Sequence, residues 1–146
     1  MRPSWDEYFM SIAKEVAKRS TCTRRNVGAV LVKDKRILAT GYNGTVRDLD
    51  HCDAVGCIRE KKKIESGTRH ELCRGLHAEQ NALLFASSYG LDTKHSVLYS
   101  TIQPCIMCAK MIVQSGIKKV VYIGDYPDVF ALDIFKEANV ELVKFK

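Results

Sequence analysis

Apolar residues recur at two spacings along the chain, one typical of helices and one of strands. Near the N-terminal end the helical spacing is carried by Trp5, Tyr8, Phe9, Ile12, Ala13 and Val16. Ser4 and Glu7 form the pattern of a capping box at the start of this run, which predicts a helix from Ser4 to about Arg19. Two β-rich runs, residues 27–32 and 37–42, flank a short polar stretch and predict an antiparallel hairpin.

Helical and strand patterns alternate through the C-terminal half. The predicted helices cover residues 77–88, 105–114 and 129–138, and the predicted strands cover residues 97–101, 120–123 and 140–145. Strands that are separated by helices pair in parallel, and the helices cover the faces of the sheet. The pattern therefore predicts an α/β fold.

Residues 43–76 interrupt this alternation with a polar, charged stretch that contains the pieces HC, GC and HELC. We interpret it as an insertion bearing Cys and His residues within a single domain covering residues 1–146, because a chain of this length builds one core. No run approaches the roughly 20 apolar residues of a membrane helix, so no membrane partner is expected.

Composition indicates the cellular compartment and the kind of partner molecule. The first residues, MRPSWDEYFM, lack the basic end and apolar run of a secretory signal, which predicts a cytoplasmic protein. In a reducing compartment, six cysteines favour metal ligands or catalytic groups over disulfides. A net charge of +6 favours anionic partners without choosing between a nucleotide phosphate and a nucleic acid. Arg24 and Arg25 are interpreted as an exposed basic pair, with contact to a phosphate as the alternative.

Two short motifs predict a metal site. In TIQPCIMCAK, Pro104 begins a helix, and Cys105 and Cys108 lie three residues apart on one face of its first turn. The helix N-terminus favours their thiolate forms. His77, 28 positions earlier at another helix start, supplies a third ligand. A lone His at a helix start is usually a satisfied polar residue, and a lone Cys-x-x-Cys is often half of a structural zinc site or a redox pair. Three protein ligands together leave the fourth position of tetrahedral zinc open, as in catalytic sites.

Glu79 lies two residues after the histidine ligand and is the predicted catalytic base. Two thiolates cancel the charge of a zinc ion, so the water that it activates is less acidic than at an all-histidine site and needs a nearby base. A carboxylate can take a proton from water and pass it to a substrate.

The pattern His-x-Glu followed by Pro-Cys-x-x-Cys is the signature of zinc nucleobase deaminases. With Gly28 in the first strand, GYNG at 41–44, HAEQNA at 77–82, PCIMCAK at 104–110 and SGIKKVVY at 115–122, nearly the whole chain resembles deoxycytidylate deaminases. The resemblance implies a three-layer α/β/α cytidine deaminase-like fold with a five-stranded mixed sheet. It also implies zinc-dependent hydrolysis of dCMP to dUMP and ammonia, the supply route to thymidylate.

Further site residues follow from the resemblance. In related deaminases the backbone N–H that matches Ala78 holds the base carbonyl, and the main chain near Gln103 holds the amino group. Asn43 is expected to hydrogen-bond the deoxyribose, although Asn-Gly after a strand is also a common turn. Tyr126 is expected to line the nucleotide site, with simple packing as the alternative.

A second, structural zinc is also implied, because some deoxycytidylate deaminases carry one on cysteines that Cys22 and Cys52 match. A closed set of four thiolates suits a structural site, and such a site would stabilise an insertion with little apolar surface. Free buried thiols are the alternative. The proposed ligands are Cys22, Cys52, Cys57 and Cys73, with His70 or His51 as substitutes.

The resemblance further implies a homo-oligomer, a hexamer by analogy, with dCTP and dTTP as effectors. The loop after GYNG reads TVRDLDHC and lacks the glycine of regulated members, which leaves allosteric control open. Two other functions stay open: a transfer-RNA adenosine deaminase and a non-catalytic, zinc-stapled binding module. GYNG, Asn81 and the insertion favour the nucleotide enzyme, so no nucleic-acid partner is expected.

Overall fold

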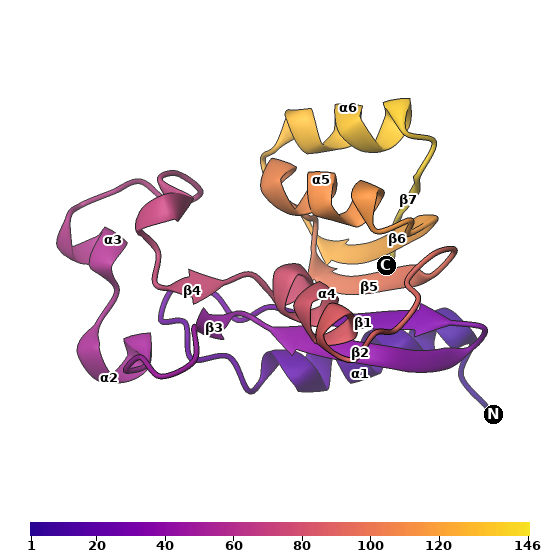
Figure 1. Cartoon of the computed structure of the whole chain (residues 1–146), viewed down its shortest axis with the longest axis horizontal. Coiled ribbons are helices and arrows are strands. Elements are labelled where there is room, and N and C mark those ends of the chain that lie inside the picture. The colour runs from indigo at the N-terminus through magenta and orange to yellow at the C-terminus, as the bar shows by residue number, and fades with distance from the viewer.

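A five-stranded mixed sheet forms the centre of the molecule (Figure 1). The computed structural model describes residues 1–146, and the strand order is β2-β1-β5-β6-β7. The strands are β1 (Gly28–Lys33), β2 (Arg36–Tyr42), β5 (Val97–Ile102), β6 (Lys119–Gly124) and β7 (Glu141–Lys144). β1 pairs antiparallel with β2 and β5, whereas the β5–β6 and β6–β7 pairs are parallel. The predicted hairpin and the parallel strands after it are confirmed.

Helices cover both faces of this sheet. On one face α1 (Trp5–Ala17) packs Phe9 and Met10 against β-strand residues that include Val30. On the other face α4 (Ala78–Ser88), α5 (Ile106–Gln114) and α6 (Val129–Glu137) enclose the larger apolar core. The three-layer α/β/α arrangement is therefore confirmed. No helix combines the length and the apolarity that crossing a bilayer requires.

The first helix begins as predicted and ends two residues early. The Glu7 N–H donates to Ser4 Oγ at 3.2 Å, and the Ser4 N–H donates to Glu7 Oε2 at 2.7 Å, which completes the capping box. At the other end, the N–H groups of residues 18–20 bond to carbonyls three residues back. This tightening of the last turn ends α1 at Ala17 instead of Arg19.

Residues 43–76 form a lobe beside the sheet, which we call the insertion lobe (Figure 1). Its base is closed where β3 (Gly44–Thr45) pairs antiparallel with β4 (Gly75–Leu76). Between these strands lie only short helical turns: α2 (Cys52–Val55), α3 (Ile58–Lys61) and the 3₁₀ turn η1 (His70–Leu72). Its buried residues are Cys52, Cys57 and Arg59. The lobe therefore has very little apolar core of its own.

Gly41 sets how closely β2 approaches the start of α4. A Cβ at this position would overlap the carbonyl oxygen of Ala78 and lie 2.5 Å from the Ala82 nitrogen. We expect Gly41→Ala to lower the free energy of unfolding by about 3 kcal/mol, because helix backbone must move to admit the methyl group. Denaturant titration measures the loss. Thr40→Ala, an exposed neighbour on the same strand, is the control; an equal loss in both variants would contradict the close approach.

Candidate metal centre and substrate cavity

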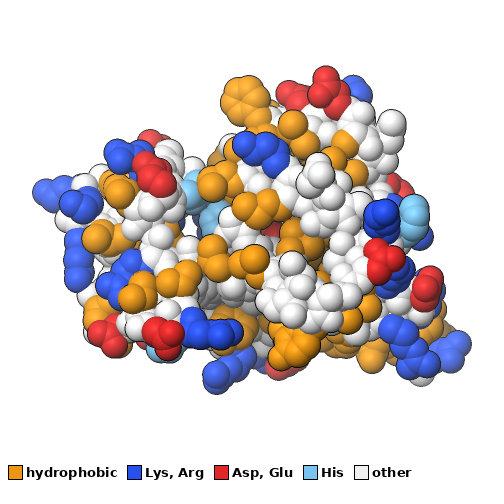
Figure 2. Space-filling model, viewed as in Figure 1, with side chains coloured by type: hydrophobic (Ala, Val, Ile, Leu, Met, Phe, Trp, Pro, Cys, Tyr) orange, Lys and Arg blue, Asp and Glu red, His pale blue; other side chains and the backbone are white.

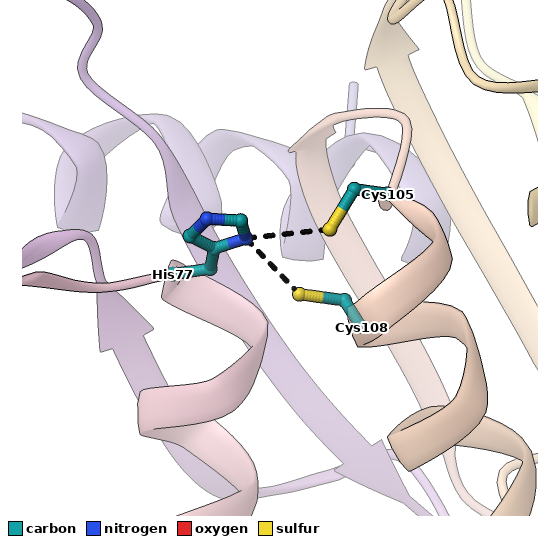
Figure 3. A group of neighbouring side chains, drawn as sticks. All are labelled: His77, Cys105 and Cys108. Carbon is teal, nitrogen blue, oxygen red and sulfur yellow. Dashed lines mark hydrogen bonds between the residues drawn. The ribbon is translucent and has the colours of Figure 1, made fainter. Parts of the chain in front are cut away.

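Two helix starts bring one imidazole and two thiols together (Figure 3). His77 directly precedes α4, Cys105 directly precedes α5, and Cys108 lies in the first turn of α5. His77 Nδ1 lies 3.3 Å from Cys108 Sγ and 3.5 Å from Cys105 Sγ, and all three donor atoms lie within 4.8 Å of one another. The nitrogen and sulfur ligands of a tetrahedral zinc ion lie about 3.5 Å apart. The three side chains therefore fit a zinc ion.

The pKa values of the two thiols are shifted in opposite directions. Hydrogen bonding to Cys108 and His77 lowers the pKa of Cys105 to about 4, whereas the hydrogen bond to Cys105 and burial raise the pKa of Cys108. The lowered pKa favours the thiolate form of Cys105, which is the form that binds metals. An ion held by both sulfurs would displace the Cys108 proton, because metal binding releases protons from its ligands.

The cysteines outside this centre do not form a comparable group. No other set of three His, Cys, Asp or Glu donor atoms lies within 4.8 Å. Cys22, Cys52, Cys73 and His70 line one cavity, but Cys57 and His51 do not. The second, structural zinc on Cys22, Cys52, Cys57 and Cys73 is thus not shown by the structure and stays a prediction.

Glu79 places a buried carboxyl beside the metal centre. It lies in the first turn of α4, is 3% exposed, and lines the same cavity as His77 and Cys105. Burial raises the pKa of Glu79 to about 7, against the opposing effect of nearby His77. A carboxyl that titrates near neutral pH can both accept and donate protons there.

A cavity of about 100 Å³ extends from the metal centre to the insertion lobe. Figure 2 shows the surface hollowed between the lobe and the rest of the molecule, with histidine at its wall. Every predicted substrate-binding residue lines this cavity: Asn43, Ala78, Gln103 and Tyr126. The sequence motifs thus converge on one cavity, although they come from four different parts of the chain.

The side chains of Asn43 and Gln103 are anchored to the protein's own backbone. Asn43 Oδ1 accepts a hydrogen bond from the Val27 N–H at 2.8 Å, and its Nδ2 donates to the Arg25 carbonyl at 2.7 Å. Gln103 Nε2 donates to the Asp128 carbonyl at 3.2 Å. These bonds hold the cavity wall in shape, and the contact of Asn43 with a sugar stays a prediction.

Tyr126 closes the cavity against the insertion lobe. The Arg25 guanidinium lies 5.2 Å from the centroid of its ring, and its hydroxyl lies 3.4 Å from His70 Nε2. A Cβ on Gly67 would lie 3.0 Å from the same hydroxyl, so the lobe packs directly on the tyrosine. Tyr126 therefore lines the cavity, and its contact with a nucleotide stays a prediction.

Two side chains that the sequence did not single out hold the helix starts in place. Gln80 Oε1 accepts a hydrogen bond from the His77 N–H at 2.8 Å. Asp128 accepts from the Ile106 N–H of α5 at 2.7 Å and from the Ala131 N–H of α6 at 3.1 Å, so one carboxylate caps two helices. The spacing of Gln80 from His77 is that of a capping box, which can be recognised from the sequence alone. The contact between Asp128 and Ile106 spans 22 residues and has no local signal.

The interpretation of Arg24 as an exposed residue is wrong. Its side chain is 18% exposed and lines the cavity, because Nη2 donates to the Ile64 carbonyl at 3.1 Å and Nε lies 3.5 Å from Glu60 Oε1. Arg25 is exposed as expected, although it also reaches the cavity. Arg59 of the insertion lobe lines the cavity as well, and nothing in the sequence pattern distinguished it.

Comparison with known proteins gives concordant matches. Residues 3–124 match the family described as the cytidine and deoxycytidylate deaminase zinc-binding region. Deoxycytidylate deaminase of Schizosaccharomyces pombe is 43% identical over 145 residues, which cover 99% of this chain and 45% of that protein. ComE operon protein 2 of Bacillus subtilis is 42% identical over 140 residues, which cover 95% of this chain and 70% of that protein. The chain thus spans less than half of the yeast relative.

A solved structure matches over its full length. The dCMP deaminase from cyanophage S-TIM5 in complex with dCMP and dUMP superposes with a TM-score of 0.83 at 35% identity, covering 99% of both chains. The described fold therefore corresponds to nearly all of that chain.

Proposed function

The chain belongs to the cytidine and deoxycytidylate deaminase zinc-binding family, and from this premise we propose that it hydrolyses dCMP to dUMP and ammonia. The observation that carries the proposal is the buried carboxyl of Glu79 in one cavity with the donor group of His77, Cys105 and Cys108. Relatives named for this activity, and a solved relative bound to dCMP and dUMP, support the choice of substrate.

Each residue of the site has its own role in the proposed reaction. His77, Cys105 and Cys108 would hold a zinc ion, which supplies Lewis-acid activation of water when bound. Glu79 takes a proton from the water that attacks C4 of cytosine and delivers one to N3. The same carboxyl then transfers a proton to the departing amine, which leaves as ammonia. A pKa of about 7 suits a group that must give and take protons in turn.

Backbone groups at the same helix starts would orient the base. Ala78 is the first residue of α4, and the first N–H groups of a helix lack intrahelical partners and carry partial positive charge. We assign the Ala78 N–H to the base carbonyl and the main chain at Gln103 to the amino group. Asn43, which anchors the cavity wall, is assigned to the deoxyribose.

Ammonia release from a panel of dCMP, dCTP, cytidine and transfer RNA tests the proposed reaction. We expect the highest kcat/KM with dCMP. Release from transfer RNA alone would overturn the proposal in favour of RNA editing, and release from none would favour a non-catalytic zinc module. Repeating the assay with dCTP and dTTP present tests their role as effectors.

We also propose that copies of the chain assemble into a homo-oligomer in the cytoplasm. Support comes from large apolar side chains exposed on two neighbouring helices of one face: Leu84 and Phe85 on α4, and Met107 and Met111 on α5. Small domains of this kind bury such faces against further copies. A hexamer is the assembly that the family resemblance favours.

A further inference from the structure

The two sulfur donors of the metal centre depend on where α5 begins. The segment before it, residues 103–105, belongs to neither β5 nor α5, and Pro104 has no N–H to bond. Cys105 is the N-cap residue, but its side chain makes no capping hydrogen bond, because its sulfur points toward His77 (Figure 3). An N-cap side chain normally satisfies the first amides of a helix. At α5 that bond has to come from another part of the chain.

The end of β6 and the loop after it, residues 124–128, supply these bonds. The Gln103 N–H donates to the Gly124 carbonyl at 2.7 Å, and Gln103 Nε2 donates to the Asp128 carbonyl at 3.2 Å. Asp128 Oδ2 accepts from the Ile106 N–H, the first amide of α5, at 2.7 Å. Hydrogen bonds on both sides of the Cys105 ligand therefore end on one short stretch of chain, and two of the three end on Asp128.

Asp128 is itself held in one orientation. Its N–H donates to the Tyr126 carbonyl at 2.8 Å, and Oδ1 accepts from the Ala131 N–H at 3.1 Å as the N-cap of α6. Because each carboxylate oxygen bonds to a different helix, the side chain cannot turn away from α5 without losing its cap on α6. A carboxylate also bonds more strongly to a first-turn amide than a neutral acceptor does.

We propose that Asp128 is a positioning residue of the metal centre. It holds Gln103 and Ile106, and with them the segment that places both sulfurs, so it sets the metal affinity and the rate of turnover. Groups that orient metal ligands without touching the metal contribute about 10- to 100-fold to affinity or activity. The part on turnover rests on the proposed function, whereas the part on metal affinity needs only the donor group.

Asp128→Asn isolates the contact with α5. Asparagine has one acceptor oxygen and is as good an N-cap as aspartate, so it can keep the local cap on α6 but cannot also accept from Ile106. The backbone carbonyl that holds Gln103 is unchanged. We expect the affinity for Co²⁺, measured by competition with a chromophoric chelator, to fall about 10-fold. The cobalt–thiolate absorption bands should shift, because the sulfurs are less firmly placed.

Turnover of dCMP by the zinc-loaded Asp128→Asn variant separates positioning from substrate binding. We expect kcat to fall about 10-fold and KM to stay within about 2-fold. Ala78 and Asn43, which are assigned to the base and the sugar, lie on other elements and keep their places. A rise in KM at unchanged kcat would place Asp128 in substrate binding and overturn the proposal.

Ser4→Ala is the matched control, because it also removes a helix cap. Its helix, α1, packs on the sheet face opposite to α4 and α5. We expect it to lower the denaturation midpoint, as Asp128→Asn does, but to leave Co²⁺ affinity, the absorption bands and kcat unchanged. The same loss of Co²⁺ affinity in both variants would assign Asp128 to general stability. Unchanged affinity and bands in Asp128→Asn would remove it from the metal centre.

Two further measurements keep the test independent of folding and of the reaction. In the unaltered protein, the Ile106 amide should exchange with solvent at least about 10-fold more slowly than that of Trp5, the first amide of α1, which has no acceptor. Equal exchange contradicts the proposal even where Asp128→Asn unfolds. A protein whose Co²⁺ affinity depends on Asp128 but which releases no ammonia from dCMP would retain this role for Asp128 and lose the proposed reaction.

Discussion

Replacing Glu79 by glutamine is expected to lower kcat for dCMP by about 10⁴-fold, the upper range for a general acid–base group, while bound zinc stays unchanged. Glu79 is buried and is the sole carboxylate that lines the cavity, so no other carboxylate there can take over its proton transfers. Glutamine preserves the shape of the side chain but cannot accept the proton of the attacking water. Ammonia release and zinc content, measured on the same preparation, check both halves of the expectation.

Glu71→Gln, on the exposed surface of the insertion lobe, is the control and should retain full activity. Two outcomes would count against the assignment. Wild-type turnover in Glu79→Gln would remove this carboxyl from the chemistry. A parallel loss of zinc and turnover would show that Glu79 supports the metal centre and does not move protons.

Replacing Cys105 by serine is expected to remove the catalytic zinc and to lower kcat/KM for dCMP by at least about 10³-fold, because several kcal/mol of Lewis-acid stabilisation is lost. Cys105 lies 3.5 Å from His77 Nδ1 and is one of the three donors of the metal centre, so its loss leaves two protein ligands. Metal analysis and ammonia release on one preparation measure the effect. Lys110→Gln, an exposed position on the same helix, should change neither quantity.

The same metal analysis counts the second, structural zinc. If Cys22, Cys52, Cys57 and Cys73 hold an ion, the unaltered protein carries two zinc ions per chain and Cys105→Ser carries one. One zinc ion per chain in the unaltered protein and none in Cys105→Ser would contradict the second site. Full zinc and activity in Cys105→Ser would instead contradict the catalytic centre.

Local spacing explains why the metal ligands were predictable. Cys105 and Cys108 lie within one helical turn, and His77 and Glu79 lie within another, so each pair is placed by the geometry of its own helix start. The alternation of apolar spacings likewise predicted the order of helices and strands, since burial of one face follows directly from that period. The capping box of Ser4 and Glu7 was readable for the same reason.

The positions of Arg24 and Arg59 in the cavity wall were not predictable in this way. Arg24 and Arg59 come from separate segments, and Arg59 lies in the insertion lobe, where no apolar period constrains the chain. Their burial depends on carbonyl groups of residues 64 and 68, which a local pattern cannot indicate. Asp128 is a similar case, because its contact with Ile106 depends on how α5 and α6 pack.

The sequence by itself indicated the layered fold and the two motifs of the candidate metal centre, because each motif depends on residues a few positions apart in one regular element. Only the tertiary structure decided which polar side chains of the irregular lobe turn inward. Contacts between distant segments depend on the balance of burial and hydrogen bonding over the whole fold. No periodic pattern in the sequence indicates that balance.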